Sequence, residues 1–122
     1  MIATDSSSLV SFLNDETGQD VMQVLQAIEA GRLVLPPVVV TEVVSGAPRS
    51  MDAILPNIAL LGVLDGYWQR AGANRRLLHD KGLNAKLGDA LIAQSCIDHG
   101  VPLITRDSDF RHFAKYCGLK LA

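Results

Sequence analysis

Apolar residues recur at two different spacings, and the two spacings alternate along the chain. Short continuous apolar runs bounded by turn residues are typical of buried strands, whereas apolar positions three and four apart indicate amphipathic helices. The predicted strands are residues 1–4, 32–35, 58–63, 101–105 and 119–122. The predicted helices are residues 9–13, 18–30, 38–45, 51–55, 67–81, 89–100 and 110–116.

The segment Val38–Ser45 is the element whose type the pattern leaves open. Its residues VVVTEVV favour a strand by composition. They follow Pro36 and Pro37, however, and proline is well tolerated in the first turn of a helix, so we predict a helix. Burying the isolated carboxylate of Glu42 uncompensated would be very costly. We therefore expect that side chain to face water, a cation or a partner.

Alternating strands and helices imply right-handed crossovers and a parallel sheet that helices cover on both faces. The predicted fold class is α/β: a three-layer α/β/α sandwich with a central parallel sheet, in one domain over residues 1–122. Ligands bind such sheets outside the carboxyl ends of the strands, where the strand order reverses. Asp5 and Asp107 each follow a predicted strand. If the first and fourth strands are neighbours, both carboxylates stand at that crevice.

Residues 88–110, GDALIAQSCIDHGVPLITRDSDF, join a helix to a strand and carry acids at both ends. Asp89 lies at the start of the apolar helix that Gly100 closes. The strand that follows delivers Asp107 and Asp109 to the surface. A helix N-terminus and a strand C-terminus face the same edge of a parallel sheet, so Asp89 and Asp107 can converge.

Composition narrows the class of protein. Hydrophobic residues make up 48% and charged residues 20%, which is typical of a globular domain. No apolar run approaches the roughly 20 residues of a bilayer span, and the N-terminus has no signal-peptide pattern. We therefore expect a cytoplasmic protein that does not enter a membrane. Cys96 and Cys117 have the spacing of neither a zinc site nor a redox motif, and we predict reduced, structural thiols.

The net charge of −2 argues against a protein that simply coats nucleic acid. Residues 1–68 hold two basic and eight acidic residues, whereas residues 69–122 hold nine and five. A basic strip in the second part is either a contact for phosphates or a solvated helix face. It contains Arg70, Arg75, Arg76, Lys81 and Lys86.

Four acids from four separate segments can meet at one edge of the sheet: Asp5, Glu42, Asp89 and Asp107. Carboxylates without a basic partner repel one another, and their pKa values rise unless a divalent cation neutralises the group. Oxygen-only ligation suits Mg²⁺ or Mn²⁺. Such a site can activate water and neutralise the charge that develops on a phosphodiester, so we predict phosphodiester hydrolysis.

Three further positions bear on this site. Asp109 lies two positions beyond Asp107 and could supply the fourth carboxylate instead, although we rank Asp107 first. Ser7 and Thr105 carry hydroxyls that could orient carboxylates or water, although both are also ordinary residues for a helix start or a strand end. At about 100° per residue, Asp98 falls on the opposite side of the helix from Asp89 and should lie outside the site.

The whole set of motifs resembles the PIN-domain ribonucleases, and within them the small VapC-type toxins of bacterial and archaeal toxin–antitoxin pairs. The resemblance rests on a strand running into Asp5-x-Ser7, on Glu42 in a short helix, on DALIAQSCIDHGVPLITRDSDF at 89–110, and on the closing GLKL. The third piece is the most specific. The chain is short between Glu42 and Asp89, a region that often helps to shape the substrate groove in the family.

This resemblance implies a sheet in the order 3-2-1-4-5 and Mg²⁺- or Mn²⁺-dependent cleavage of RNA by an activated water. It also implies a homodimer and a cognate antitoxin partner whose tail enters the acidic crevice. Matched by position, the metal-binding acids are Asp5, Glu42, Asp89 and Asp107, and the accessory positions are Ser7 and Thr105, with Asp109 as the alternative acid. The candidate RNA-binding residues are Arg75, Arg76 and Lys86.

Two alternatives remain at this point. A receiver-like signalling module also gathers acids around Mg²⁺, but it expects an acidic pair after its first strand, where this chain has Asp5 followed by three serines. Glu42 would have no role in such a module. The other alternative is an inactive PIN scaffold that only binds a partner.

Overall fold

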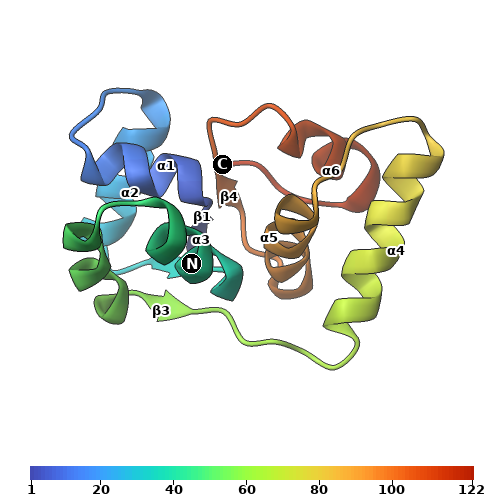
Figure 1. Cartoon of the computed structure of the whole chain (residues 1–122), viewed down its shortest axis with the longest axis horizontal. Helices are drawn as coiled ribbons and strands as arrows, with labels where there is room; N and C mark the ends of the chain where they lie inside the picture. Colours follow the sequence, from blue (N-terminus) through green and yellow to red (C-terminus); the bar gives the residue numbers. More distant parts are fainter.

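A computed structural model describes all residues from 1 to 122. Figure 1 shows β1 and β4 in the middle of the molecule, with β3 and helices α1, α2 and α3 on one side of the view and α4, α5 and α6 on the other. The strands are β1 (Ile2–Thr4), β2 (Leu33–Leu35), β3 (Ala59–Leu60) and β4 (Leu103–Ile104). The helices are α1 (Ser6–Leu13), α2 (Gln19–Glu29), α3 (Pro37–Gly46), α4 (Tyr67–Asp80), α5 (Leu87–His99) and α6 (Phe110–Cys117), with a 3₁₀ helix η1 (Arg49–Asn57).

The sheet is parallel throughout and has the order β3-β2-β1-β4. Its central strand β1 pairs with β2 on one side and with β4 on the other, so the strand order reverses at β1. The predicted α/β fold with a parallel sheet flanked by helices is therefore confirmed. The fifth strand predicted over residues 119–122 lies beside β4, in the place that the order 3-2-1-4-5 gives it, but it is reduced to a single parallel bridge between Leu103 and Leu121.

Two proline-containing segments differ in how far the sequence predicts them. The segment left open by its composition is helical, because Pro37 occupies the first turn of α3, where its missing N–H is not needed. The short helix predicted at 51–55 is a longer 3₁₀ helix with Pro56 inside it. The strand predicted at 58–63 shrinks to the two exposed residues of β3 at the edge of the sheet.

One hydrophobic cluster fills the interior and includes residues from every helix. Phe110 and Phe113 of α6 are almost fully buried, as the spacing of the apolar residues predicts. Two apolar residues of α4 whose spacing makes them available for packing, Trp68 and Leu77, are instead 62% and 40% exposed. Tyr67, next to Trp68, takes the inward position and donates a hydrogen bond to the carbonyl of Leu91 at 2.7 Å.

Two other features bear on the predictions made for membrane insertion and for the cysteines. None of the helices is both long and apolar enough to cross a membrane. Both cysteines are free thiols, with Cys96 buried and Cys117 partly buried. Burial raises the pKa of the Cys96 thiol to about 12, which makes that thiol unreactive at neutral pH.

Candidate metal centre

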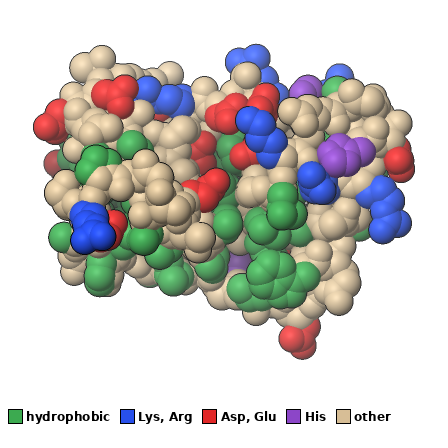
Figure 2. Space-filling model, viewed as in Figure 1, with side chains coloured by type: hydrophobic (Ala, Val, Ile, Leu, Met, Phe, Trp, Pro, Cys, Tyr) green, Lys and Arg blue, Asp and Glu red, His purple; other side chains and the backbone are tan.

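The acids predicted to converge are delivered by four different elements. Asp5 follows β1, Glu42 lies in α3, Asp89 lies in the first turn of α5, and Asp107 and Asp109 follow β4. The register of the sheet pairs Thr4 with Ile104, which places the ends of β1 and β4 side by side. Figure 2 shows acidic side chains gathered in the middle of one face, with Lys and Arg side chains next to them.

Asp5 is the most firmly held of these carboxylates. It is the N-cap of α1 and is 3% exposed. One oxygen accepts a hydrogen bond from the backbone N–H of Ser8 at 2.9 Å. The other accepts from the hydroxyl of Ser7 at 2.8 Å and from the hydroxyl of Thr105. Burial raises the pKa of Asp5 in spite of these hydrogen bonds, which lower it.

Asp89, Asp107 and Asp109 form the tightest acidic cluster. Each offers a carboxylate oxygen, and these oxygens all lie within 4.8 Å of one another. Burial raises the pKa of Asp89 to about 6, and repulsion from the neighbouring acids, Asp107 first, adds to the rise. One oxygen of Asp89 is buried and has no hydrogen-bond partner. A buried carboxylate oxygen without a partner is costly on its own, and a cation would satisfy it.

From the sequence we predict Asp107 rather than Asp109 as the fourth acid, whereas the structure brings both carboxylates to the cluster. The backbone N–H of Asp109 donates to Oδ1 of Asp107 at 2.9 Å, which folds the loop so that both carboxylates face Asp89. The Nζ of Lys86 lies 4.0 Å from Oδ2 of Asp109. Lys86 also lowers the pKa of Asp89, so one cation of the chain already partly offsets the repulsion.

Glu42 lies against the first turn of α5. A Cβ on Gly88 would stand 3.1 Å from Oε2 of Glu42, so the absence of a side chain at Gly88 leaves room for this carboxylate. The hydroxyl of Ser6 donates to Oε1 of Glu42 at 2.6 Å. Sequence reasoning missed both Ser6 and Gly88. Serines after an aspartate are ordinary residues for a helix start, and nothing in a single sequence links Ser6 to a residue 36 positions away.

The remaining predicted residues divide into those near the acids and those apart from them. The Thr105 hydroxyl reaches Asp5 and accepts from the N–H of Asp107 at 3.0 Å. Asp98 lies outside the site, as its place on the helix predicts, and it accepts two hydrogen bonds from Arg70 at 2.9 and 2.6 Å. Arg70 is therefore an intramolecular partner rather than a free basic residue.

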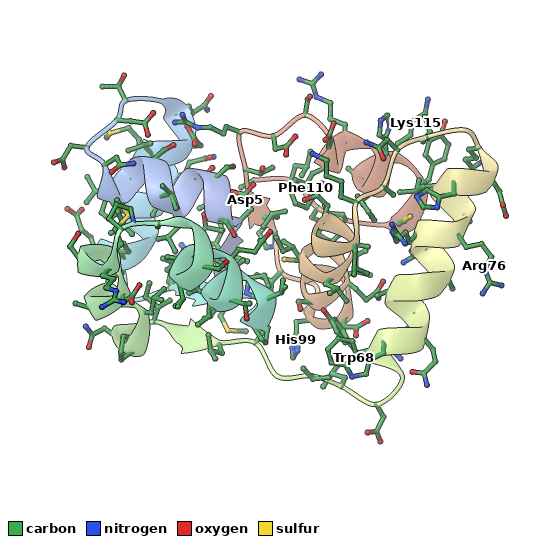
Figure 3. The ribbon with its side chains drawn as sticks, in the orientation of Figure 1. Asp5, Trp68, Arg76, His99, Phe110 and Lys115 are labelled. Atoms are coloured by element: carbon green, nitrogen blue, oxygen red, sulfur yellow. The ribbon has the colours of Figure 1, made fainter.

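The three residues predicted to bind RNA lie at different distances from the acidic cluster. Lys86 stands at the acidic cluster. The Nε of Arg75 donates to the carbonyl of Ala85 at 2.8 Å, next to Lys86, and leaves its terminal nitrogens available. Arg76 points outward from α4, away from α5 (Figure 3). Of the three, Lys86 is the best placed to meet a phosphate that is bound at the acids.

The chemistry of this donor set fits a hard divalent cation. All its groups are carboxylate oxygens, and the orphaned Asp89 oxygen points to a ligand that the chain does not itself supply. Zinc in structural sites takes histidine or cysteine ligands, and neither residue belongs to this cluster. The residues present therefore fit a divalent cation at the carboxyl ends of β1 and β4.

Comparison with known proteins agrees with this geometry. No curated protein sequence matches the chain. The fold is similar to that of two solved structures, VapBC2 from Rickettsia felis bound to a DNA fragment from its promoter, and FitAcB from Neisseria gonorrhoeae. The first has a TM-score of 0.76 at 21% identity, covering 100% of this chain and 98% of that one. The second has a TM-score of 0.72 at 16% identity, covering 99% and 96%.

The family model for the PIN domain matches residues 2–116, which is nearly the whole chain. This match excludes the receiver-like alternative, which has a different family signature. It agrees with the sheet order and with the acids at the ends of β1 and β4. The chain belongs to the PIN domain family.

Proposed function

We propose that this protein is a metal-dependent endoribonuclease and the toxin of a type II toxin–antitoxin pair. Membership of the PIN domain family supports a nuclease. The observation that carries the metal dependence is the Asp89 cluster, in which three carboxylates lie within 4.8 Å and one buried oxygen has no partner. A cation at this place neutralises the acids and activates the attacking water.

The residues of the chain divide the work as follows. Asp89 and Asp107 hold the cation, with Asp109 beside them, and Asp5 and Glu42 complete the acidic wall of the site. Ser7 and Thr105 fix the orientation of Asp5 through their hydroxyls. The phosphates of the RNA meet the basic residues Lys86, Arg75 and Arg76.

The partner that we propose is an antitoxin protein, in the cytoplasm of the cell. The two structures of similar fold are complexes named VapBC2 and FitAcB, which supports a protein partner of the same kind for this chain. An arginine of such a partner would find at the acidic cluster the carboxylates that suit bidentate pairing. Inhibition of cleavage by the partner would follow, since it would occupy the place of the cation and the RNA.

A homodimer is the second assembly that we propose. Apolar side chains from three segments gather beside the acids, and Figure 2 shows them as a green area along the lower middle of the face. This apolar face consists of Val38, Val63, Trp68, Leu87 and Leu91. Trp68 and Leu87 are 62% and 61% exposed, and exposed apolar side chains gathered in this way mark an interaction surface. A second copy of the chain would bury both.

Trp68→Glu tests this homodimer. We expect the wild-type protein to elute as a dimer in size-exclusion chromatography with light scattering, and the variant to elute as a monomer, because the new charge would be desolvated at the interface. Met22→Glu is the matched control, since Met22 is 53% exposed on α2, outside the apolar face. A wild-type monomer, or a Trp68→Glu dimer, would contradict the proposed interface.

The enzyme is tested by incubating the purified protein with structured RNAs in Mg²⁺, in Mn²⁺ and in chelator. We expect cleavage in the first two conditions, none in the third, and products with 5′-phosphate and 3′-hydroxyl ends, because an activated water attacks the phosphorus and the 3′-oxygen leaves. Cleavage that persists in chelator would exclude the metal mechanism. Absence of cleavage in every condition would favour the inactive scaffold.

A further inference from the structure

The loop that carries two of the acids, Thr105–Asp109, is held mainly by side chains. Its only backbone-to-backbone hydrogen bonds are two turns into the start of α6, in which the N–H of Phe110 donates to the carbonyl of Asp107 at 3.4 Å and that of Arg111 donates to the carbonyl of Ser108 at 3.1 Å. The Thr105 hydroxyl ties one end of the loop to Asp5. The next residue, Arg106, ties it to the opposite side, where α2 begins. The position of Asp107 therefore depends on these two tethers together with the turn into α6.

Arg106 is fixed by several acceptors at the start of α2. Its Nε donates to Oδ2 of Asp20 at 2.8 Å, and its Nη2 donates to Oδ1 at 3.2 Å, so the pair is bidentate. The same Nη2 donates to the carbonyl of Thr17 at 3.4 Å, and Nη1 lies 3.6 Å from Glu16. A bidentate pair of this kind fixes geometry as well as adding attraction.

The chain leaves space for this pair. Asp20 is 12% exposed, and it also accepts a hydrogen bond from the hydroxyl of Ser8 at 2.8 Å. A Cβ on Gly18 would stand 2.6 Å from Oδ1 of Asp20 and 3.2 Å from Nη2 of Arg106. Gly18 has a φ of +149°, a conformation that favours glycine. The N-terminus of α2 therefore accommodates the guanidinium closely.

These contacts close a ring around the site. Ser8 donates its backbone N–H to Asp5 and its hydroxyl to Asp20, Asp20 binds Arg106, and the neighbour Thr105 returns to Asp5. We infer that Arg106, clamped by Asp20, is a positioning residue that holds the loop bearing Asp107 and Asp109 against Asp89. This inference rests on the proposed function, because it assigns Arg106 to the cation site of the same nuclease.

The main competing role for Arg106 is contact with an RNA phosphate. Its guanidinium already has donors committed to Asp20 and Thr17, and its side chain is 35% exposed. A phosphate would have to replace the Asp20 carboxylate or share the remaining nitrogen with Glu16. The two roles predict different measurements, since positioning acts on cation affinity and turnover, whereas phosphate contact acts on binding of RNA.

The experiment compares Arg106→Ala, Arg106→Lys and Asp20→Asn with the wild-type protein. Binding of Mn²⁺ alone is measured by calorimetry, and kcat and KM are measured on an RNA that the wild type cleaves. We expect Mn²⁺ affinity and kcat to fall about 10-fold in Arg106→Ala, the range for groups that orient metal ligands, with KM unchanged. Asp20→Asn should show the same pattern. Arg106→Lys should rescue only part of the loss, because lysine cannot form the bidentate pair.

Arg70→Ala is the matched control. Arg70 forms a bidentate pair with Asp98 of similar geometry, but that pair joins α4 to α5 away from the acids. We expect this variant to bind Mn²⁺ like the wild type. Equal weakening in Arg70→Ala and Arg106→Ala would overturn the inference in favour of a general loss of stability. Unchanged Mn²⁺ affinity with a raised KM in Arg106→Ala would overturn it in favour of an RNA contact.

The calorimetric measurement separates this inference from the proposed function. If the wild-type protein cleaves no RNA, the nuclease proposal fails, and the Mn²⁺ affinities of the variants still decide whether Arg106 positions the acids. If the wild type cleaves RNA and Arg106→Ala binds Mn²⁺ normally with normal kcat, the nuclease proposal stands and the positioning role of Arg106 fails.

Discussion

Asp89→Asn is expected to abolish metal-dependent RNA cleavage while making the metal-free protein more stable. Asp89 carries the oxygen that is buried without a partner, within 4.8 Å of the carboxylates of Asp107 and Asp109. We expect the rate to fall by more than about 100-fold, because the loss of an outer group that only orients a metal ligand already costs about 10- to 100-fold. Cleavage of a labelled RNA in Mn²⁺ measures the loss, and near-normal activity would remove Asp89 from the mechanism.

The gain in stability follows from the raised pKa of Asp89, which is about 6 against an ordinary value of 3.8. Well below pH 3.8 the carboxyl is protonated in both the folded and the unfolded protein. As the pH rises towards 6, the unfolded chain ionises first, so the free energy of unfolding falls. At pH 7.5 the charged carboxylate destabilises the metal-free protein by about 1–2 kcal/mol, once solvent screening of this partly buried group is allowed for.

Urea unfolding in chelator between pH 4 and pH 8 measures this effect. We expect the wild type to lose free energy of unfolding relative to Asp89→Asn as the pH rises through that window, and Mn²⁺ to restore the wild type more than the variant. Asp80→Asn is a control for the general change of charge, since Asp80 is exposed at the end of α4. A difference between wild type and Asp89→Asn that does not vary with pH would contradict the raised pKa.

The parts of the site that the sequence could predict are those fixed by local rules. Residues 88–110 combine a helix with a glycine end, a short strand and acids at both ends of the segment, and parallel topology forces the ends of such elements to one edge. Pro37 likewise decided the helix α3 against the strand preference of its valines. In both cases a few neighbouring residues determine the backbone, so a single sequence is sufficient.

The parts that the sequence could not predict depend on contacts between distant residues. Arg106 meets Asp20 across 86 positions, and an arginine in a loop gives no sign of which acid it will bind. The exposure of Trp68 could not be predicted for another reason. The spacing of the apolar residues indicates that one side of α4 is apolar, but not whether Tyr67 or Trp68 faces the core. A surface that a second copy covers has the same apolar pattern as an interior.

Substitution of Asp5 is expected to have the second large effect. Comparing Asp5→Asn with Asp5→Ala separates the role of Asp5 in stability from its role in RNA cleavage. Asp5→Asn keeps an oxygen to accept from the N–H of Ser8, while the new amide can donate to the hydroxyls of Ser7 and Thr105, which rotate to accept. We expect the free energy of unfolding to stay within about 1 kcal/mol, because asparagine is also a good N-cap. We expect cleavage to be lost, because the negative charge next to Asp107 is gone.

Asp5→Ala should lose cleavage and stability together. It removes the N-cap of α1 and leaves the buried N–H of Ser8 without its acceptor, which together costs about 2–4 kcal/mol. Urea unfolding and the RNA assay on both variants separate the two effects. If Asp5→Asn is as unstable as Asp5→Ala, the loss of activity reports damage to the fold. If Asp5→Asn cleaves RNA like the wild type, Asp5 caps the helix and contributes nothing to the cation site.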